Sequence, residues 1–159
     1  MKPPTLCACQ SVAFMISVSV APLARVIISR ICAPLLSIAR EKAVSPYVGD
    51  GAKRWAAAPL KYVANLYRLA VEKTGPGATT YHAVQEEGVT LRDIAQMIAK
   101  GLKVPLVSIP AEKAGEHFGM FFGHAATLDM PASSEWTRKT LGWESTGPGL
   151  IEDLANMKY

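Results

Sequence analysis

The clearest pattern of apolar and polar positions along the chain lies between Thr90 and Gly101. Apolar residues recur there at the spacing of one helix face, and the positions between them are polar. Thr90 suits the capping position, Asp93 follows three residues later as a capping box requires, and Gly101 is suited to end the helix. The pattern predicts an amphipathic helix. Its apolar face consists of Leu91, Ile94, Ala95, Ile98 and Leu102.

Short apolar runs on both sides of this helix are typical of strands. Residues 79–84 precede it, a polar segment at 85–88 is expected to be a turn, and residues 104–109 follow it. A helix that connects two strands of one sheet places them in parallel through a right-handed crossover. The chain is therefore predicted to have an α/β or α+β fold, in which the helix covers the two strands that flank it.

The rest of the chain alternates between helical patterns and turns. Helices are predicted at 34–42, 62–73, 111–118, 133–141 and 150–157, with a short extended segment at 44–47. Glycine-containing turns are predicted at 49–51, 75–77 and 147–149. The aromatic cluster at 118–122 is interpreted as core, in preference to the wall of an apolar pocket.

Composition places the chain among globular proteins. Its 159 residues are 50% hydrophobic and 19% charged, which suits one packed domain better than a disordered tail. The formal net charge is +4, but Lys2, Arg25, Arg30 and Arg40 all precede the first acidic residue, Glu41. Because the charges nearly balance from there onward, we predict no nucleic-acid-binding face.

Residues 1–31 form an apolar, basic leader, which we separate from the region 32–159. Its apolar run at 12–24 is shorter than the roughly 20 residues that cross a bilayer, and Arg25 and Arg30 interrupt any extension, so no membrane span is predicted. Two interpretations remain open: a mitochondrial targeting segment, or a leader without a targeting function. We expect a cytoplasmic location, with mitochondria as the alternative.

The cysteines and histidines do not indicate a structural or metal-binding framework. Cys7, Cys9 and Cys32 are an odd number, which argues against a set of disulfides. Cys7 and Cys9 are too close together for an ordinary zinc pair. His117 and His124 have no cysteine or carboxylate at ligand spacing, so no metal site is predicted.

Several longer runs together resemble the carboxyl-terminal half of NAD(P)-dependent epimerase/dehydratase-like proteins, the extended and atypical branch of the short-chain dehydrogenase/reductase superfamily. These runs are IAREKAVSPYVGDGAKRW, LYRLAVEK, YHAVQEEGVTLRDIAQMIAKGL, LDMPASS and LGWESTGPGLIEDL. The resemblance covers roughly residues 31–159, and the order and spacing of the runs both agree with it. It implies the substrate-side portion of a Rossmann-type extended short-chain dehydrogenase, without the glycine-rich nucleotide-binding half.

The parts that perform chemistry in such proteins are missing from this sequence. The resemblance implies NAD or NADP as cofactor, bound by a glycine-rich turn after the first strand, but Gly49-Asp50-Gly51 lacks the third glycine. The family also uses a Tyr-x-x-x-Lys pair as acid and base, and no tyrosine here has a lysine four residues later. A usual His and Asp are replaced near Pro59 and Tyr62. We therefore assign no catalytic and no cofactor-binding residue.

Three residues remain as candidates for substrate contact: Tyr47, Arg54 and Trp55. The resemblance places Arg54 and Trp55 at the substrate cleft, where an arginine is suited to pair with a phosphate or carboxylate. Tyr47 lies just before the same turn. His82 is expected to be a hydrogen-bonded structural histidine, and the acidic pair at 86–87 a solvated turn.

The resemblance implies a truncated NAD(P)-dependent oxidoreductase or epimerase/dehydratase-like protein that retains the substrate-binding part and is not catalytic alone. Whether the chain itself is an enzyme stays open. Its expected partner is a small-molecule substrate, such as a nucleotide sugar or another carbonyl or hydroxyl compound. The alternative is a non-enzymatic folded remnant that binds a small molecule or a protein. Loss of the other half would expose apolar surface, so self-association is also expected.

Overall fold

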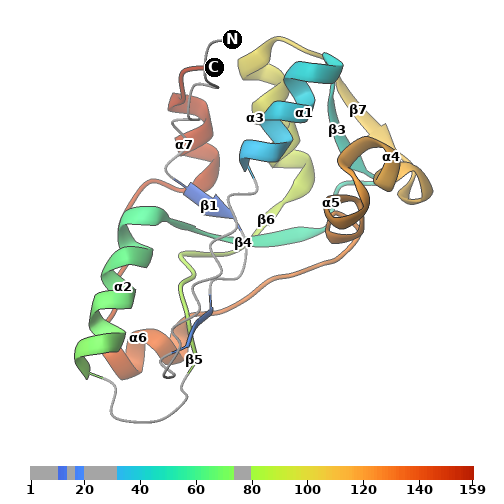
Figure 1. Ribbon diagram of the computed structural model, residues 1–159. Coiled ribbons are helices and arrows are strands. Elements are labelled where there is room, and N and C mark those ends of the chain that lie inside the picture. The colour runs from blue at the N-terminus through green and yellow to red at the C-terminus, as the bar shows by residue number, and fades with distance from the viewer. Residues whose placement is uncertain (1–10, 14–16, 20–31, 74–79) are drawn as a thin grey trace, which may run out of the picture.

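The computed structural model describes residues 11–13, 17–19, 32–73 and 80–159, and it has the mixed α/β architecture that the sequence predicts (Figure 1). The strands are β1 (Ser11–Ala13), β2 (Ser17–Ser19), β3 (Ser45–Val48), β4 (Arg54–Pro59), β5 (Thr80–His82), β6 (Glu86–Thr90) and β7 (Leu106–Ile109). The helices are α1 (Cys32–Lys42), α2 (Leu60–Lys73), α3 (Leu91–Leu102), η1 (Ala111–Lys113), α4 (Ala114–Phe118), α5 (Met120–Ala125), α6 (Glu135–Leu141) and α7 (Leu150–Asn156). The turn predicted at 75–77 lies outside the described residues.

The strands of the described part form three small sheets. Strand β4 lies between β1 and β6 and is antiparallel to both, β2 pairs with β5 in antiparallel orientation, and β3 pairs with β7 in parallel. The strands on either side of α3 therefore do not pair with each other, and that prediction is wrong. The parallel partner of β7 is β3, which lies much earlier in the chain, so the parallel connection includes β4, α2, β5, β6 and α3.

Residues 86–88 of the predicted polar turn at 85–88 are strand, and only Gln85 is a bend, which also corrects the sequence prediction. Strand β6 starts at Glu86 and aligns with β4, with Trp55 opposite Val89 and Ala57 opposite Glu86. The backbone pairing is compatible with polar residues because Glu87 is exposed and Glu86 has a partner of its own: its Oε2 accepts from the backbone N–H of Leu150 at 2.6 Å. This contact fixes the start of α7 against β6.

Helix α3 begins where the sequence predicts, but its terminating residue lies two positions beyond the predicted Gly101. The Thr90 hydroxyl oxygen accepts from the Asp93 backbone N–H at 3.1 Å and its O–H donates to the Asp93 carboxylate at 2.6 Å, which confirms the cap. The left-handed residue at the other end is Lys103, with φ of 55°, and Gly101 lies inside the helix. Gly101 is required there for a different reason: the ring of Tyr159 occupies the space that a Cβ would fill.

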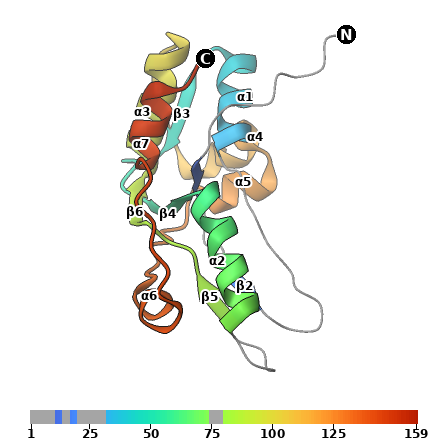
Figure 2. The same ribbon diagram turned by 90° about the vertical axis from the view of Figure 1, so that its left-hand side faces the viewer.

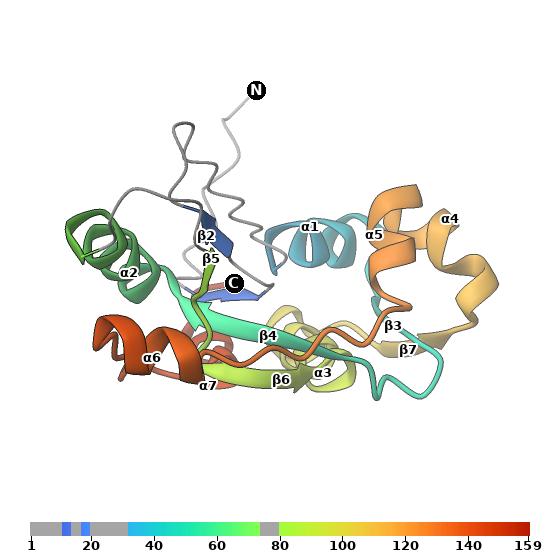
Figure 3. The same ribbon diagram turned by 90° about the horizontal axis from the view of Figure 1, so that it is seen from below.

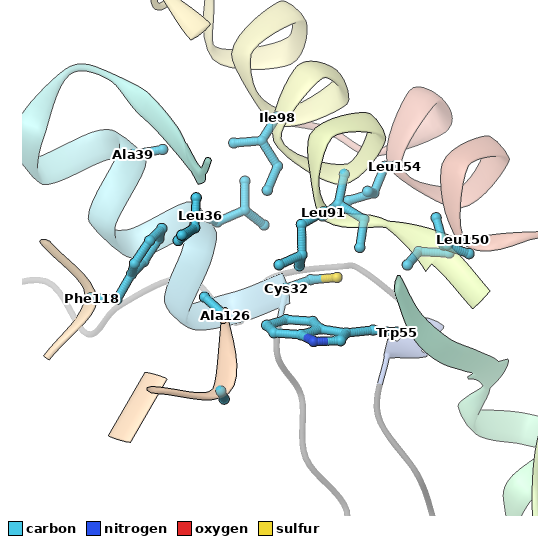
Figure 4. Close-up of a cluster of buried hydrophobic side chains, with 14 of the residues drawn as sticks. Cys32, Leu36, Ala39, Trp55, Leu91, Ile98, Phe118, Ala126, Leu150 and Leu154 are labelled. Atoms are coloured by element: carbon cyan, nitrogen blue, oxygen red, sulfur yellow. The ribbon is translucent and has the colours of Figure 1, made fainter. Parts of the chain in front are cut away.

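The main hydrophobic core lies between α3, α1, α7 and strand β4 (Figure 4). The buried residues of α3 are Leu91, Ile94, Ala95, Ile98 and Ala99. Four of the five predicted face positions are thus buried, and Leu102 is partly buried. The buried thiol of Cys32 belongs to this core. Trp55, which is 1% exposed, contributes the largest side chain.

A second, smaller core lies under α2 and α6, at the opposite end of the molecule from α4 and α5 (Figures 2 and 3). It contains Ala58, Val63, Leu66, Ala70, Tyr81, Ala83, Leu141 and Trp143. Gly142 ends α6 in the left-handed conformation, with φ of 64°, as the sequence predicts. Within residues 32–73 and 80–159, no helix has the length and apolarity that a bilayer crossing requires.

The aromatic cluster at 118–122 is only partly core. Phe118 is buried, but Met120 is 90% exposed and Phe121 is 74% exposed, so the core interpretation is wrong for these two residues. The reason is the backbone at Gly119, where φ of 77° and ψ of 160° separate α4 from α5 in a conformation open to glycine alone. The close approach of Gly123 to the backbone of Ala114 then holds the two short helices together.

Replacing Gly123 by alanine tests this close approach. A Cβ at Gly123 would lie 2.6 Å from the carbonyl carbon of Ala114 and from the Gly115 backbone nitrogen, so a backbone segment must move. We expect Gly123→Ala to lower the free energy of unfolding by about 1–3 kcal/mol, the usual cost of overpacking. Urea denaturation followed by circular dichroism measures the change.

Gly115→Ala is the matched control, since a Cβ there meets no atom within 4 Å. We expect this variant to be as stable as the parent chain, or slightly more stable because alanine favours helix. Equal stability of the two alanine variants would contradict the packing described for α4 and α5.

Candidate functional site

The candidate residues surround the loop at 49–53, which connects β3 to β4. Backbone hydrogen bonds to β7 and β3 fix the conformation of this loop. The Gly49 N–H donates to Ile109 O on β7 at 2.9 Å, and the Gly51 N–H donates to Val48 O on β3 at 2.9 Å. Gly49 and Gly51 adopt φ of 60° and 73°, which glycine tolerates without strain. The loop is therefore an ordered connection that sets the positions of Tyr47 and Arg54.

The same loop occupies the amino terminus of α3. The backbone N–H of Leu91 donates to Lys53 O at 2.8 Å, and that of Arg92 donates to Gly51 O at 3.1 Å. The next amide, Asp93 N–H, is capped by the Thr90 side chain. Helix amino termini bind phosphate through such N–H groups when these are unpaired. The first three N–H groups of α3 are thus engaged within the chain and are not free to bind a phosphate.

Tyr47 is half-buried on β3 and contacts the first turn of α3. The Arg92 guanidinium carbon lies 5.9 Å from the centre of its ring, within the range of a cation–π contact. A Cβ at Gly51 would lie 2.8 Å from Tyr47 Cδ2, so the ring packs directly on the loop backbone. The Tyr47 side chain is thereby held between loop and helix.

Arg54 makes a two-pronged ion pair with Asp129. Its Nη2 lies 2.8 Å from Asp129 Oδ2, its Nε lies 3.2 Å from Oδ1, and its backbone N–H donates to the same Oδ1 at 2.7 Å. The two side chains are 50% and 36% exposed. The sequence resemblance assigns the Arg54 guanidinium to a substrate anion, but in the structure the Asp129 carboxylate already binds it. Sequence reasoning missed Asp129 because 75 positions separate the partners and no spacing rule connects them.

The pair changes the acid–base behaviour of both groups. Hydrogen bonds from the Arg54 side chain and backbone hold the pKa of Asp129 at about 2, below its ordinary value of 3.8, and the charges of Arg54 and Lys53 contribute further. The hydrogen bond and the charge of Asp129 raise the pKa of Arg54 in turn. Both groups are therefore ionised across the physiological range.

Trp55 lies on the opposite side of β4 from Arg54, because successive residues of a strand point to opposite faces. Figure 4 shows its indole among Cys32, Leu91 and Ala126, and its buried Nε1 has no hydrogen-bond acceptor among the described residues. Trp55 and Tyr47 line one cavity of about 10 Å³, the space of a single water molecule. The structure thus brings Tyr47 and Trp55 together and separates them from the Arg54 side chain.

The segment that follows α5 crosses β4 and completes the surroundings of Arg54. Met130 forms a parallel bridge with Trp55, and its N–H donates to Arg54 O at 2.8 Å. Further on, the Ala132 N–H donates to Glu87 O at 3.0 Å, which attaches the segment to β6 as well. The backbone pairing of the residues that follow Asp129 therefore places its carboxylate beside Arg54.

The remaining sequence candidates have structural roles. The Nδ1 atom of His82 lies 3.3 Å from Ser133 O, and its backbone N–H donates to the Thr137 hydroxyl at 2.9 Å, as expected for a structural histidine. Pro59 and Tyr62, which replace the usual His and Asp, both contact Gly147. Among the described residues, no group of three or more His, Cys, Asp or Glu side chains is arranged to hold a metal ion.

No family model matches the chain. Two fungal proteins are similar to it in sequence: the uncharacterized protein C2A9.02 of Schizosaccharomyces pombe, with 43% identity over 125 residues, and the uncharacterized protein YLL056C of Saccharomyces cerevisiae, with 45% identity over 120 residues. The matches cover 79% and 76% of this chain but only 42% and 40% of the relatives. The chain thus spans about two fifths of the length of these relatives.

Two solved structures have a similar fold. One is RMD from Pseudomonas aeruginosa complexed with NADPH, with a TM-score of 0.51 and 15% identity, and the match covers 79% of this chain and 39% of that chain. The other is the epimerase Mth375 from Methanothermobacter thermautotrophicus, with a TM-score of 0.54 and 13% identity, covering 83% and 37%. At this identity the likeness shows the fold alone: the chain has the fold of part of a reductase- or epimerase-type protein.

The carboxyl titration of Asp129 tests the ion pair with Arg54. In Arg54→Gln the side-chain hydrogen bond and the positive charge are weakened or lost, so we expect the pKa of Asp129 to rise from about 2 toward its ordinary value. The rise is incomplete, because the backbone N–H of residue 54 still donates. Side-chain carboxyl NMR as a function of pH measures it.

Glu135 is the internal control for that titration. The hydrogen bond and charge of Lys139 lower its pKa, and neither partner touches Arg54. Since the folded-state pKa of Asp129 is depressed, its stabilising effect is present above about pH 4 and is lost as the pH falls through about 2. An Asp129 titration that is identical in the parent chain and in Arg54→Gln would refute the pairing.

Tryptophan fluorescence tests the burial of Trp55. Trp55 and Trp143 are 1% and 0% exposed, whereas Trp136 is 54% exposed. We expect acrylamide to quench mainly Trp136, so Trp136→Phe should remove most of the quenchable signal and Trp55→Phe should leave it in place. Strong loss of quenching in Trp55→Phe would show instead that its indole reaches solvent.

Proposed function

We propose that this chain is the substrate-side part of an NAD(P)-dependent oxidoreductase or epimerase/dehydratase-like protein, and that it is not catalytic alone. The observation that carries the proposal is the fold likeness to the NADPH-complexed RMD and to the epimerase Mth375, of which the chain covers 39% and 37%. A cofactor-binding part would then belong to the remaining length, as the coverage of the fungal relatives also suggests. The region 32–159 is the part to which the proposal applies.

The proposed ligand is a small molecule such as a nucleotide sugar or another carbonyl or hydroxyl compound, in contact with Tyr47, Arg54 and Trp55. Contact with Trp55, which is 1% exposed, requires β4 or the residues that cover its indole to rearrange. For Arg54 to bind a phosphate or carboxylate of such a ligand, that group has to replace Asp129 at the guanidinium. Exchange of one anion for another is physically reasonable at this pair because both side chains are partly exposed. Asp129 then acts as a competitor that weakens binding. Self-association and a cytoplasmic location accompany this proposal.

A second candidate function, a non-enzymatic remnant that binds a small molecule or a protein, is favoured by one specific observation. The Arg54 fork is already satisfied by Asp129, and Trp55 is buried beside a cavity of about 10 Å³. A site in this arrangement has neither an unpaired charge nor space for a substrate. The two candidates differ in whether nucleotide sugars bind at all.

Thermal unfolding of the purified chain with added ligands distinguishes them. A ligand at about 100 times its dissociation constant adds roughly 2.7 kcal/mol of stability if it binds only the folded state. We expect no upward shift of the unfolding midpoint with NAD(H) or NADP(H), and an upward shift with at least one nucleoside-diphosphate sugar. A shift with a dinucleotide would show a cofactor site within this chain, and no shift with any nucleotide sugar would favour the remnant.

Two variants make the result specific to Arg54. Arg54→Gln removes the proposed anion contact and should reduce the shift, whereas Asp129→Asn removes the competing carboxylate and should increase it. Arg68→Gln is the matched control, because Arg68 forms an exposed ion pair with Glu72 on α2. Equal shifts in all three variants would remove Arg54 from the proposed site.

A further inference from the structure

An open groove of about 460 Å³ lies between α6 and the start of β6, and none of Tyr47, Arg54 and Trp55 lines it. Ser133, Ser134, Glu135 and Arg138 line one side, and Glu87 with its neighbours at 84–85 lines the other. Its volume falls within the roughly 300–1,000 Å³ that small-molecule sites occupy. Figures 2 and 3 show α6 beside the segment between β5 and β6, which forms the opposite wall together with the start of β6.

Arg138 is a half-buried cation that has no anionic partner in the described part of the chain. Its Nε donates to the Ser134 hydroxyl at 3.0 Å and its Nη2 donates to Val84 O at 3.2 Å. The guanidinium carbon also lies 5.3 Å from the ring centre of Trp143. These contacts fix the orientation of the guanidinium, but both hydrogen-bond acceptors are neutral, and Nη1 has no partner among the described residues. A fixed guanidinium with an unused edge is suited to bind a carboxylate.

Glu87 on the other wall is an anion without a cationic partner. It is exposed on β6 and forms no ion pair among the described residues, and in particular none with Arg138. The remaining carboxylate of the groove, Glu135, is neutralised by Lys139 at 2.6 Å. Among the described residues, one unpaired positive charge and one unpaired negative charge therefore line the same groove and form no ion pair with each other.

We propose that this groove binds a small zwitterion, a molecule with one carboxylate and one ammonium group, such as a free amino acid. Arg138 would take the carboxylate and Glu87 the ammonium, so that both charges of the groove become paired. The lining residues include no aromatic side chain on which a sugar or a base could stack. The wall is pre-organised, because the Ser134 hydroxyl also donates to Val84 O across the groove. This site is independent of the function proposed above.

The experiment uses the full chain and ω-amino acids of increasing length. Glycine, 4-aminobutanoate and 6-aminohexanoate place the same two charges at increasing separation, while butanoate and butylamine carry one charge each. NMR titration of the Arg138 side-chain Nε–H signal reports binding. We expect one length to bind at least tenfold more tightly than either single-charge compound. If no zwitterion binds more tightly than butanoate and butylamine, the proposal is wrong.

Glu87→Gln tests the ammonium contact without changing the size of the side chain, and because Glu87 is exposed the fold should tolerate it. We expect the affinity for the preferred zwitterion to fall about tenfold, while butanoate binding stays unchanged. Glu72→Gln, which removes an exposed carboxylate on α2, is the control and should bind like the parent chain. Equal zwitterion affinity in Glu87→Gln and the parent chain would overturn the assignment.

Discussion

Burial of the apolar face of α3 is the interaction on which the rest of the structure depends. Leu91, Ile94 and Ile98 are each at most 5% exposed, and complete burial of such a side chain stabilises the folded state by roughly 1.5–3 kcal/mol. The face contacts α1, β3 and α7, which come from the beginning and the end of the described region. Once these elements pack on α3, the loop at 49–53 is held over the helix amino terminus, and β4 begins at a fixed place.

This arrangement decides what the predicted site is able to do. The loop carbonyls accept hydrogen bonds from the first amides of α3, so these amides, which in a free helix terminus are suited to bind phosphate, serve the fold instead. The alternation along β4 then directs Trp55 into the core and Arg54 to the surface. Two adjacent residues that a sequence resemblance assigns to one cleft thus lie on opposite faces of a strand. Any ligand that contacts both would need a rearrangement of β4 or of the residues that cover Trp55.

Local signals in the sequence were sufficient for most helices, although not for α5 or for the end of α3, and were insufficient for the sheets. The cap at Thr90, the apolar spacing of α3 and the glycine stop at Gly142 depend on residues within one or two helical turns, and each was predicted. Strand pairing depends on partners far away in the chain. The segment of β6 is polar and resembles a turn, but its backbone pairs with β4. In the same way, neither the position of Asp129 opposite Arg54 nor the exposure of Met120 follows from local pattern.

Arg54 and Arg138 illustrate why a residue type alone does not define a site. Arg54 was a candidate because an arginine suits an anion, yet its charge is matched by Asp129 in a bidentate pair. Arg138 had no distinguishing sequence signal, yet its guanidinium is oriented by neutral acceptors and retains its charge beside an open groove. A ligand at Arg54 must displace an existing partner, whereas a ligand at Arg138 supplies a missing one. Electrostatics therefore favours ligand binding at Arg138 over Arg54, even though sequence resemblance favours the reverse.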